Sequence, residues 1–125
     1  MEHLAIAEEV GLGRLQNAEP LAEPVRLPER EAQLSTNVRS RAVRVQAPPT
    51  ALPKGQYTSL AEAMAHFCAA RQRTIEFVGG ASRLRALQVV HPFFGPITGY
   101  EFVLLLIGHP MRHAEQIQEI REQIK

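Results

Sequence analysis

Two histidines near the C-terminus, His109 and His113, are four residues apart in a segment with helical spacing. On one helix face, residues four apart have Cβ atoms about 5 to 6 Å from each other, so two imidazoles can bind one divalent cation. The same pair can instead be core histidines satisfied by hydrogen bonds, or a pair on the surface. Burying both without a shared partner is costly, and a metal ion would remove that cost.

The rest of the composition limits which chemistry is open to the chain. A single cysteine, Cys68, can form neither an intramolecular disulfide nor a thiolate zinc site, so the five histidines are the main candidates for metal binding. The formal net charge of +1 gives no reason to expect a nucleic acid partner. The longest apolar run, Phe102 to Gly108, is too short for a membrane span, and no secretory leader is recognisable. We therefore expect one cytoplasmic domain with no membrane partner.

Three segments with helical spacing must position these histidines. They are predicted at residues of about 2–17, 59–78 and 98–124. Thr58 or Ser59 followed by Glu62 is typical of a helix start, and Thr98 followed by Glu101 predicts a capping box at the start of the last helix. The fold class that follows is all-α, a bundle of three long helices within a single domain of residues 1–125.

The apolar stripe of the last predicted helix has a gap in its middle. Its members are Phe102, Val103, Leu106, Ile117, Ile120 and Ile124. His109 and His113 fill the gap, so we expect both imidazoles to point into the bundle with the isoleucines. Pro110 lies between them and has no N–H, which predicts a kink or a local widening of the helix.

A long connection separates the first two predicted helices. Residues 19–56 contain six prolines, so this segment either lies packed across the fold or joins two helices that run in the same direction. Within it, Arg39, Arg41 and Arg44 are interpreted as solvated rather than as a basic strip. Residues 81–87 suggest a short helical turn, and residues 89–96 are predicted to form a loop in which His91 holds a turn.

Three stretches of the sequence resemble the DinB-like superfamily. They are HPFFGPIT at residues 91–98 followed by HPMRHAEQI at 109–117, EHLAIAEE at 2–9, and APP at 47–49 ahead of a helix with Phe67, Arg71 and Phe77. The string HxxRHxxQI is the most specific part. The resemblance implies an up-down-down-up four-helix bundle in which three histidines hold a divalent metal. Transferred to this sequence, the ligands are His3, His109 and His113, and residues 19–56 form the crossover between two parallel helices.

The resemblance also implies an activity. It suggests a divalent-metal-dependent enzyme that acts on a small-molecule substrate, with zinc, nickel or iron as the metal. We favour a transferase that uses a low-molecular-weight thiol such as bacillithiol or mycothiol over a hydrolase, because an open dicationic site stabilises a thiolate without a protein general base. The alternative is a non-catalytic helical module that acts through a dimer surface and binds metal weakly or not at all.

The first helix of the family has no counterpart here, because the chain begins two residues before His3. Either this helix is missing or the start of the chain is assigned too late. An uncovered apolar face predicts a homodimer. The side chains expected at its contact are Leu4, Leu12, Leu15, Val103 and Leu104.

Other polar residues have two interpretations each. Arg112 and Gln116 either orient a ligand or contact an anionic substrate, or they are solvated side chains on the helix surface. For Glu8 and Glu9 we favour an exposed acidic turn over a role as carboxylates that support the metal ligands. Cys68 is interpreted as a buried structural thiol.

The polar side of the helix predicted at residues 59–78 carries His66. Because it lies opposite Phe67, we expect its imidazole to be solvated.

Overall fold

The computed structural model describes residues 1–39 and 55–124. Its elements are α1 (Glu2–Gln16), β1 (Glu19–Pro20), α2 (Pro28–Arg39), α3 (Leu60–Gly80), the short 3-10 helix η2 (Leu84–Ala86), β2 (Leu87–His91), β3 (Gly95–Thr98) and α4 (Gly99–Ile124). The described chain is mostly helical, as the all-α prediction requires, and the short turn of η2 lies where one was expected. Arg41 and Arg44 fall outside the described residues. In the part described, no helix combines the length and apolar character needed to cross a membrane.

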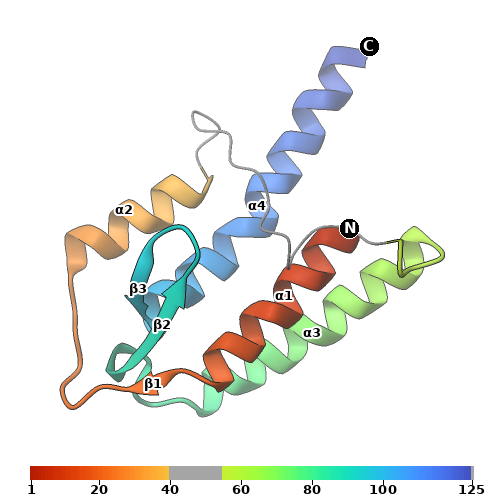
Figure 1. The fold of residues 1–125 in the computed structure, drawn as a ribbon. Coiled ribbons are helices and arrows are strands. Elements are labelled where there is room, and N and C mark those ends of the chain that lie inside the picture. Colours follow the sequence, from red (N-terminus) through yellow and green to blue (C-terminus); the bar gives the residue numbers. More distant parts are fainter. Residues whose placement is uncertain (40–54, 125) are drawn as a thin grey trace.

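Helices α1 and α3 lie side by side and run in the same direction (Figure 1). Helix α4 packs against α1 and runs the opposite way. Two parallel neighbours must be joined by a crossover, so this arrangement confirms the role expected for the long connection. It also confirms the directions that the family bundle assigns to its last three helices.

The connection is more structured than its prolines predict. Pro28 occupies the first position of α2, where the missing N–H costs nothing. The negative charges of Glu29 and Glu31 in the first turn interact favourably with the positive end of the helix dipole. Helix α2 packs against α4, and its Leu34 is buried in the core. The crossover therefore contributes a helix that covers part of α4, which the prediction of an open bundle face did not include.

The prediction of a loop at residues 89–96 was also wrong. These residues form most of an antiparallel hairpin of β2 and β3, in which His91 pairs with Gly95. The Nδ1 atom of His91 accepts hydrogen bonds from the backbone N–H groups of Phe93 and Phe94, at 3.0 and 3.2 Å. His91 therefore holds the turn as expected. Gly95 has a φ of +71°, a conformation that glycine adopts without strain and that starts the return strand.

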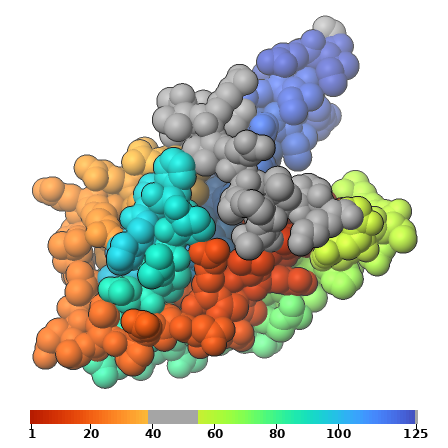
Figure 2. All heavy atoms as spheres, in the orientation of Figure 1, coloured from red at the N-terminus to blue at the C-terminus, as the bar shows by residue number. Residues whose placement is uncertain are grey.

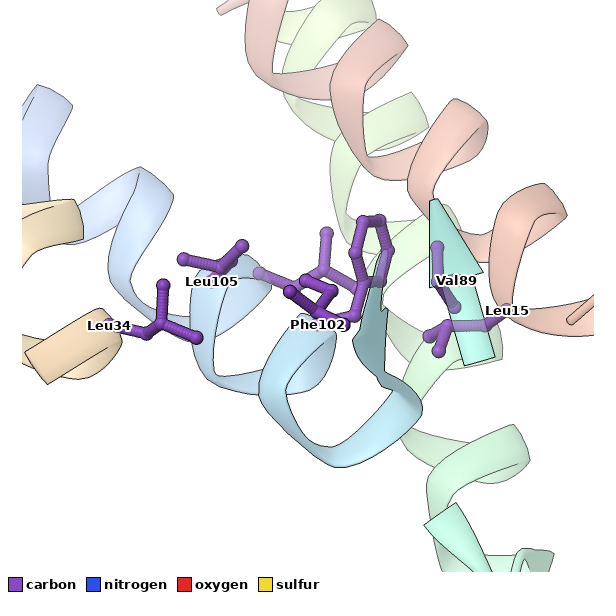
Figure 3. Close-up of a cluster of buried hydrophobic side chains, with 7 residues drawn as sticks. Leu15, Leu34, Val89, Phe102 and Leu105 are labelled. Carbon is purple, nitrogen blue, oxygen red and sulfur yellow. The ribbon is translucent and has the colours of Figure 1, made fainter. Parts of the chain in front are cut away.

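The main core lies where α1, α2, α4 and the hairpin meet. Figure 3 shows Leu15 of α1, Leu34 of α2, Val89 of β2 and Phe102 and Leu105 of α4 converging. Because the hairpin inserts Val89 and Ile97 into this cluster, it takes part in the same core as the helices. The start of α4 is fixed in this core.

The starts of α3 and α4 are capped as predicted. Ser59 Oγ accepts the N–H of Glu62 at 3.1 Å, and the Thr58 N–H donates to the Glu62 carboxylate at 2.7 Å. At α4, Thr98 Oγ1 accepts the N–H of Glu101 and the Glu101 carboxylate accepts the N–H of Thr98, at 3.1 and 2.8 Å. This second box is buried, so it fixes the register with which α4 leaves the hairpin.

The C-terminal half of α4 extends away from the body of the molecule (Figures 1 and 2). Ile117, Ile120 and Ile124 are 56, 49 and 78% exposed. The expectation that these isoleucines point into a bundle core was therefore wrong, because α1 and α2 do not extend along this part of α4. The helical phase was correct, but the neighbouring helices end before the stripe does.

Candidate metal centre

Three imidazoles converge where the N-terminal end of α1 meets the middle of α4. The Nε2 atom of His109 lies 3.1 Å from Nε2 of His3 and 3.1 Å from Nε2 of His113. One nitrogen from each residue lies within 4.8 Å of the other two. The structure thus brings together the three residues that the resemblance named, in a half-buried position.

The three nitrogens fit a metal ion better than they fit one another. A ring nitrogen carries either one hydrogen or one lone pair, so His109 Nε2 can form one well-directed hydrogen bond but faces two partners. Ligand nitrogens around a tetrahedral zinc ion are about 3.3 Å apart, given Zn–N bonds of about 2.0 to 2.1 Å. The observed 3.1 Å separations are close to that value. Three neutral imidazoles would leave a fourth position for water or substrate.

Electrostatics keep the central imidazole neutral. Burial, together with the neighbouring His113 and His3, lowers the pKa of His109 to about 3. Burial also lowers the pKa of His113. Arg112 contributes to both shifts as a nearby positive charge. At neutral pH both rings are therefore uncharged, and each keeps one nitrogen with a lone pair. A metal ligand requires that lone pair.

Gln116 contacts one member of the cluster from the next turn of α4. Its Oε1 lies 3.0 Å from Nδ1 of His113. If Nδ1 donates to this oxygen, the proton is held on the far side of the ring and Nε2 is left with the lone pair that faces His109. Arg112 is half-buried and close enough to affect His109 and His113 electrostatically. Gln116, one of the two supporting residues named from the sequence, is therefore in contact with a histidine of the cluster.

Glu8 was assigned wrongly to an exposed acidic turn. Its side chain is only 3% exposed and forms a two-point ion pair with Arg71 of α3, with N···O distances of 2.7 and 2.9 Å. The error has a physical cause, because a buried carboxylate is tolerated when a guanidinium matches both of its oxygens and the partner is 63 positions away in sequence. Glu9 is partly exposed, and its Oε1 atom lies 4.0 Å from both Nδ1 of His66 and Nη2 of Arg73.

The remaining candidates lie away from the cluster. Cys68 is exposed on α3, so the interpretation of a buried structural thiol was wrong. His66 is exposed, as predicted, and the centroid of its ring lies 4.7 Å from the centroid of the Tyr57 ring. Among the residues that the structure describes, the cluster of His3, His109 and His113 is the one group of three metal-ligating side chains that come together.

Residues 1–117 match the family model of the DinB superfamily. The chain belongs to the DinB superfamily. The match covers all three histidines, His3, His109 and His113, together with the crossover and the hairpin. No curated protein and no solved structure matches the chain at a significant level.

Membership in the DinB superfamily agrees with the arrangement of the histidines. One comes from the start of α1, and two come from a single turn of α4, which continues through Pro110. The four-residue spacing of His109 and His113 was the pattern in the sequence that indicated a possible metal site. Spacing alone could not have found His3, since it lies 106 positions from His109.

Proposed function

We propose that this DinB-superfamily protein is a divalent-metal-dependent enzyme in which His3, His109 and His113 hold the ion. The observation that carries the proposal is the convergence of the three Nε2 atoms on one point, with His109 Nε2 3.1 Å from each of its neighbours. The depressed pKa of His109 supports it, since the ring is neutral at physiological pH. Zinc, nickel and iron are all compatible with three imidazoles.

The chemistry we favour is transfer to a low-molecular-weight thiol. A divalent ion held by three neutral ligands keeps its full charge, and when bound it would polarise an oxygen or stabilise a thiolate. Hydrolysis is helped by a free carboxylate base near the metal. Glu8 is already paired with Arg71 by two contacts, so it is not available in that role. The pairing removes one candidate base for hydrolysis, which supports our preference for thiol transfer with a small-molecule substrate.

Metal analysis of protein purified without added metal or chelator tests the first part of this proposal. We expect near-stoichiometric zinc, nickel or iron in the wild type and its loss in His109→Leu. His66→Gln is the matched control, because His66 is an exposed histidine outside the cluster. Metal-free wild type that does not take up zinc, nickel or iron would favour the alternative, a non-catalytic helical interaction module.

The thiol preference has its own test. The Co²⁺-loaded protein is titrated with bacillithiol or mycothiol while the visible and near-ultraviolet spectrum is recorded. A sulfur-to-cobalt charge-transfer band is expected if the thiolate binds the ion. Metal-loaded protein whose spectrum is unchanged by either thiol would contradict thiol transfer and leave metal binding intact.

We also propose that the chain forms a homodimer. Two of the side chains expected at the contact, Leu12 and Leu15, are buried within the chain at 5 and 1% exposure, so that part of the expectation was wrong. Exposed apolar side chains remain on the outer face of α4, including Ile107 at 50%. These support association through α4 near Val103 and Leu104, which are partly exposed.

A further inference from the structure

Pro110 lies next to His109 and lacks the backbone N–H that other residues in a helix donate. In an α-helix, the carbonyl of residue 106 accepts the N–H of residue 110, and proline has none. Leu106 is buried at 8% exposure, so water does not readily replace the missing donor. Arg71 supplies it from α3, because its Nη2 donates to the Leu106 carbonyl oxygen at 2.9 Å.

The same guanidinium is held by α1. Arg71 Nε donates to Glu8 Oε1 at 2.7 Å and Nη2 donates to Glu8 Oε2 at 2.9 Å. One side chain of α3 therefore connects a carboxylate of α1 to a carbonyl of α4. Helix α3 contributes no histidine to the cluster, yet it carries the group that joins the two helices that do.

This link lies close to the histidines on both helices. Glu8 is five residues after His3, about 7.5 Å along the axis of α1, and Leu106 is three residues before His109, about 4.5 Å along α4. A shift of α1 against α4 would move His3 away from His109 and would also break the contacts of Arg71. The separation of the histidines and the Arg71 link are therefore geometrically coupled.

We propose that Glu8, Arg71 and Pro110 are positioning residues of the metal site. Pro110 frees the Leu106 carbonyl, and the guanidinium that replaces the lost donor fixes α1 against α4 so that His3 stays within bridging distance of His109. The function of this link in metal binding rests on the proposed function above, whereas its effect on the spacing of the histidines does not. An ordinary core ion pair would stabilise the fold without setting that spacing.

The test compares three variants of the full chain. E8L/R71M removes both members of the ion pair, so no unpaired charge is left buried. E8L/R71M/P110A also returns a helical N–H to the Leu106 carbonyl. The control E31L/R85M removes a similar two-point pair, with distances of 3.0 and 3.1 Å, which joins α2 to η2. Arg85 also lies over the ring of Tyr100, 3.6 Å from its centroid, but Tyr100 is at the start of α4, nine residues before His109.

Two measurements are made on each variant, in addition to its melting temperature. The first is the NOE between the ring protons of His3 and His109 in metal-free protein, whose ring centroids lie 4.9 Å apart. The second is the affinity for Co²⁺, followed through its visible spectrum. We expect E8L/R71M to lose the NOE and to bind Co²⁺ about tenfold more weakly or worse, equivalent to about 1.4 kcal/mol. The triple variant should recover melting temperature but not affinity, and E31L/R85M should bind like the wild type.

The proposal is overturned if folded E8L/R71M keeps the NOE and the affinity of the wild type, or if E31L/R85M loses affinity to the same extent. Wild type that shows the NOE without binding Co²⁺ would overturn the proposed function. In that case, loss of the NOE in E8L/R71M would still support the positioning role. If E8L/R71M does not fold, R71K serves instead, because it keeps the charge but loses the planar fork, and the same two readouts decide.

Discussion

His3 Nε2 and His109 Nε2 lie 3.1 Å apart, although 106 positions separate the two residues in the chain. The contact joins the first turn of α1 to the middle of α4, so the candidate site exists only when the whole fold has formed. A metal ion that binds there would bind the folded chain much better than the unfolded chain. Metal binding and stability should therefore be linked.

Replacing both His109 and His113 with leucine should separate the roles of metal and fold. Two half-buried polar rings become apolar side chains, so the metal-free H109L/H113L variant should melt at the temperature of metal-free wild type or above it. Metal at about 100 times its Kd should stabilise the wild type by about 2.7 kcal/mol and leave the variant unchanged. Thermal melts with and without chelator measure both effects. A metal-free variant far less stable than metal-free wild type would show that the histidines form structural hydrogen bonds instead.

The depressed pKa of His109 predicts a pH dependence in the metal-free protein. Between the folded value of about 3 and the unfolded value of about 6.5, the unfolded chain binds more protons at this residue than the folded chain does. The contribution to stability is therefore complete above pH 6.5 and is lost as the pH falls toward 3, at up to about 1.4 kcal/mol per pH unit. Urea unfolding in chelator at several pH values should show a shallower slope for H109L. An equal slope in both proteins would contradict the assignment.

Gln116 should tune the metal affinity through His113. Gln116→Leu removes the oxygen 3.0 Å from Nδ1 of His113, so the ring is less well oriented and Co²⁺ affinity should fall about 10- to 100-fold. Gln118→Leu is the matched control on the same helix, since Gln118 contacts Glu122 on the exposed face. Titrations monitored by visible absorption compare the two variants. Equal affinities would mean that Gln116 does not support the site.

Two glycines should respond in opposite directions to the same substitution. A Cβ at Gly99 would lie 2.9 Å from the Leu84 carbonyl oxygen and 3.2 Å from Leu87 Cβ, so Gly99→Ala should destabilise the fold by about 1 to 3 kcal/mol. A Cβ at Gly13 meets nothing within 4 Å, so Gly13→Ala in α1 should stabilise it by about 0.5 to 1 kcal/mol. Denaturant unfolding gives both values. A Gly99→Ala variant as stable as wild type would show that η2 can move away from α4.

Sedimentation equilibrium at low micromolar concentration should find a homodimer. Association through α4 predicts that Ile107→Gln weakens the dimer, because it places a polar group in an apolar contact. Leu60→Gln is the control, since Leu60 is exposed at 66% but lies on α3. A monomeric wild type would indicate that α2 covers enough of α4 for the chain to stand alone.

The sequence by itself determined the local features of this protein. The four-residue spacing of His109 and His113 places them together on α4 because helical geometry depends on near neighbours only. The box of Thr98 and Glu101 marked the start of α4 for the same reason. The family resemblance supplied His3, which no local pattern could have joined to the other two histidines.

Only the tertiary structure decided what each element contacts. Helix α2 was not predicted, because the prolines of the crossover were interpreted as breaks. A proline at the first position of a helix is nevertheless compatible with it, and Pro28 has that position in α2. Glu8 became a buried partner because Arg71, 63 positions away, reaches it in the fold. Ile117 has the helical phase of a core residue but is exposed, because the elements packed against α4 do not extend to its C-terminal half. Phase is a property of one helix, whereas burial depends on where its neighbours end.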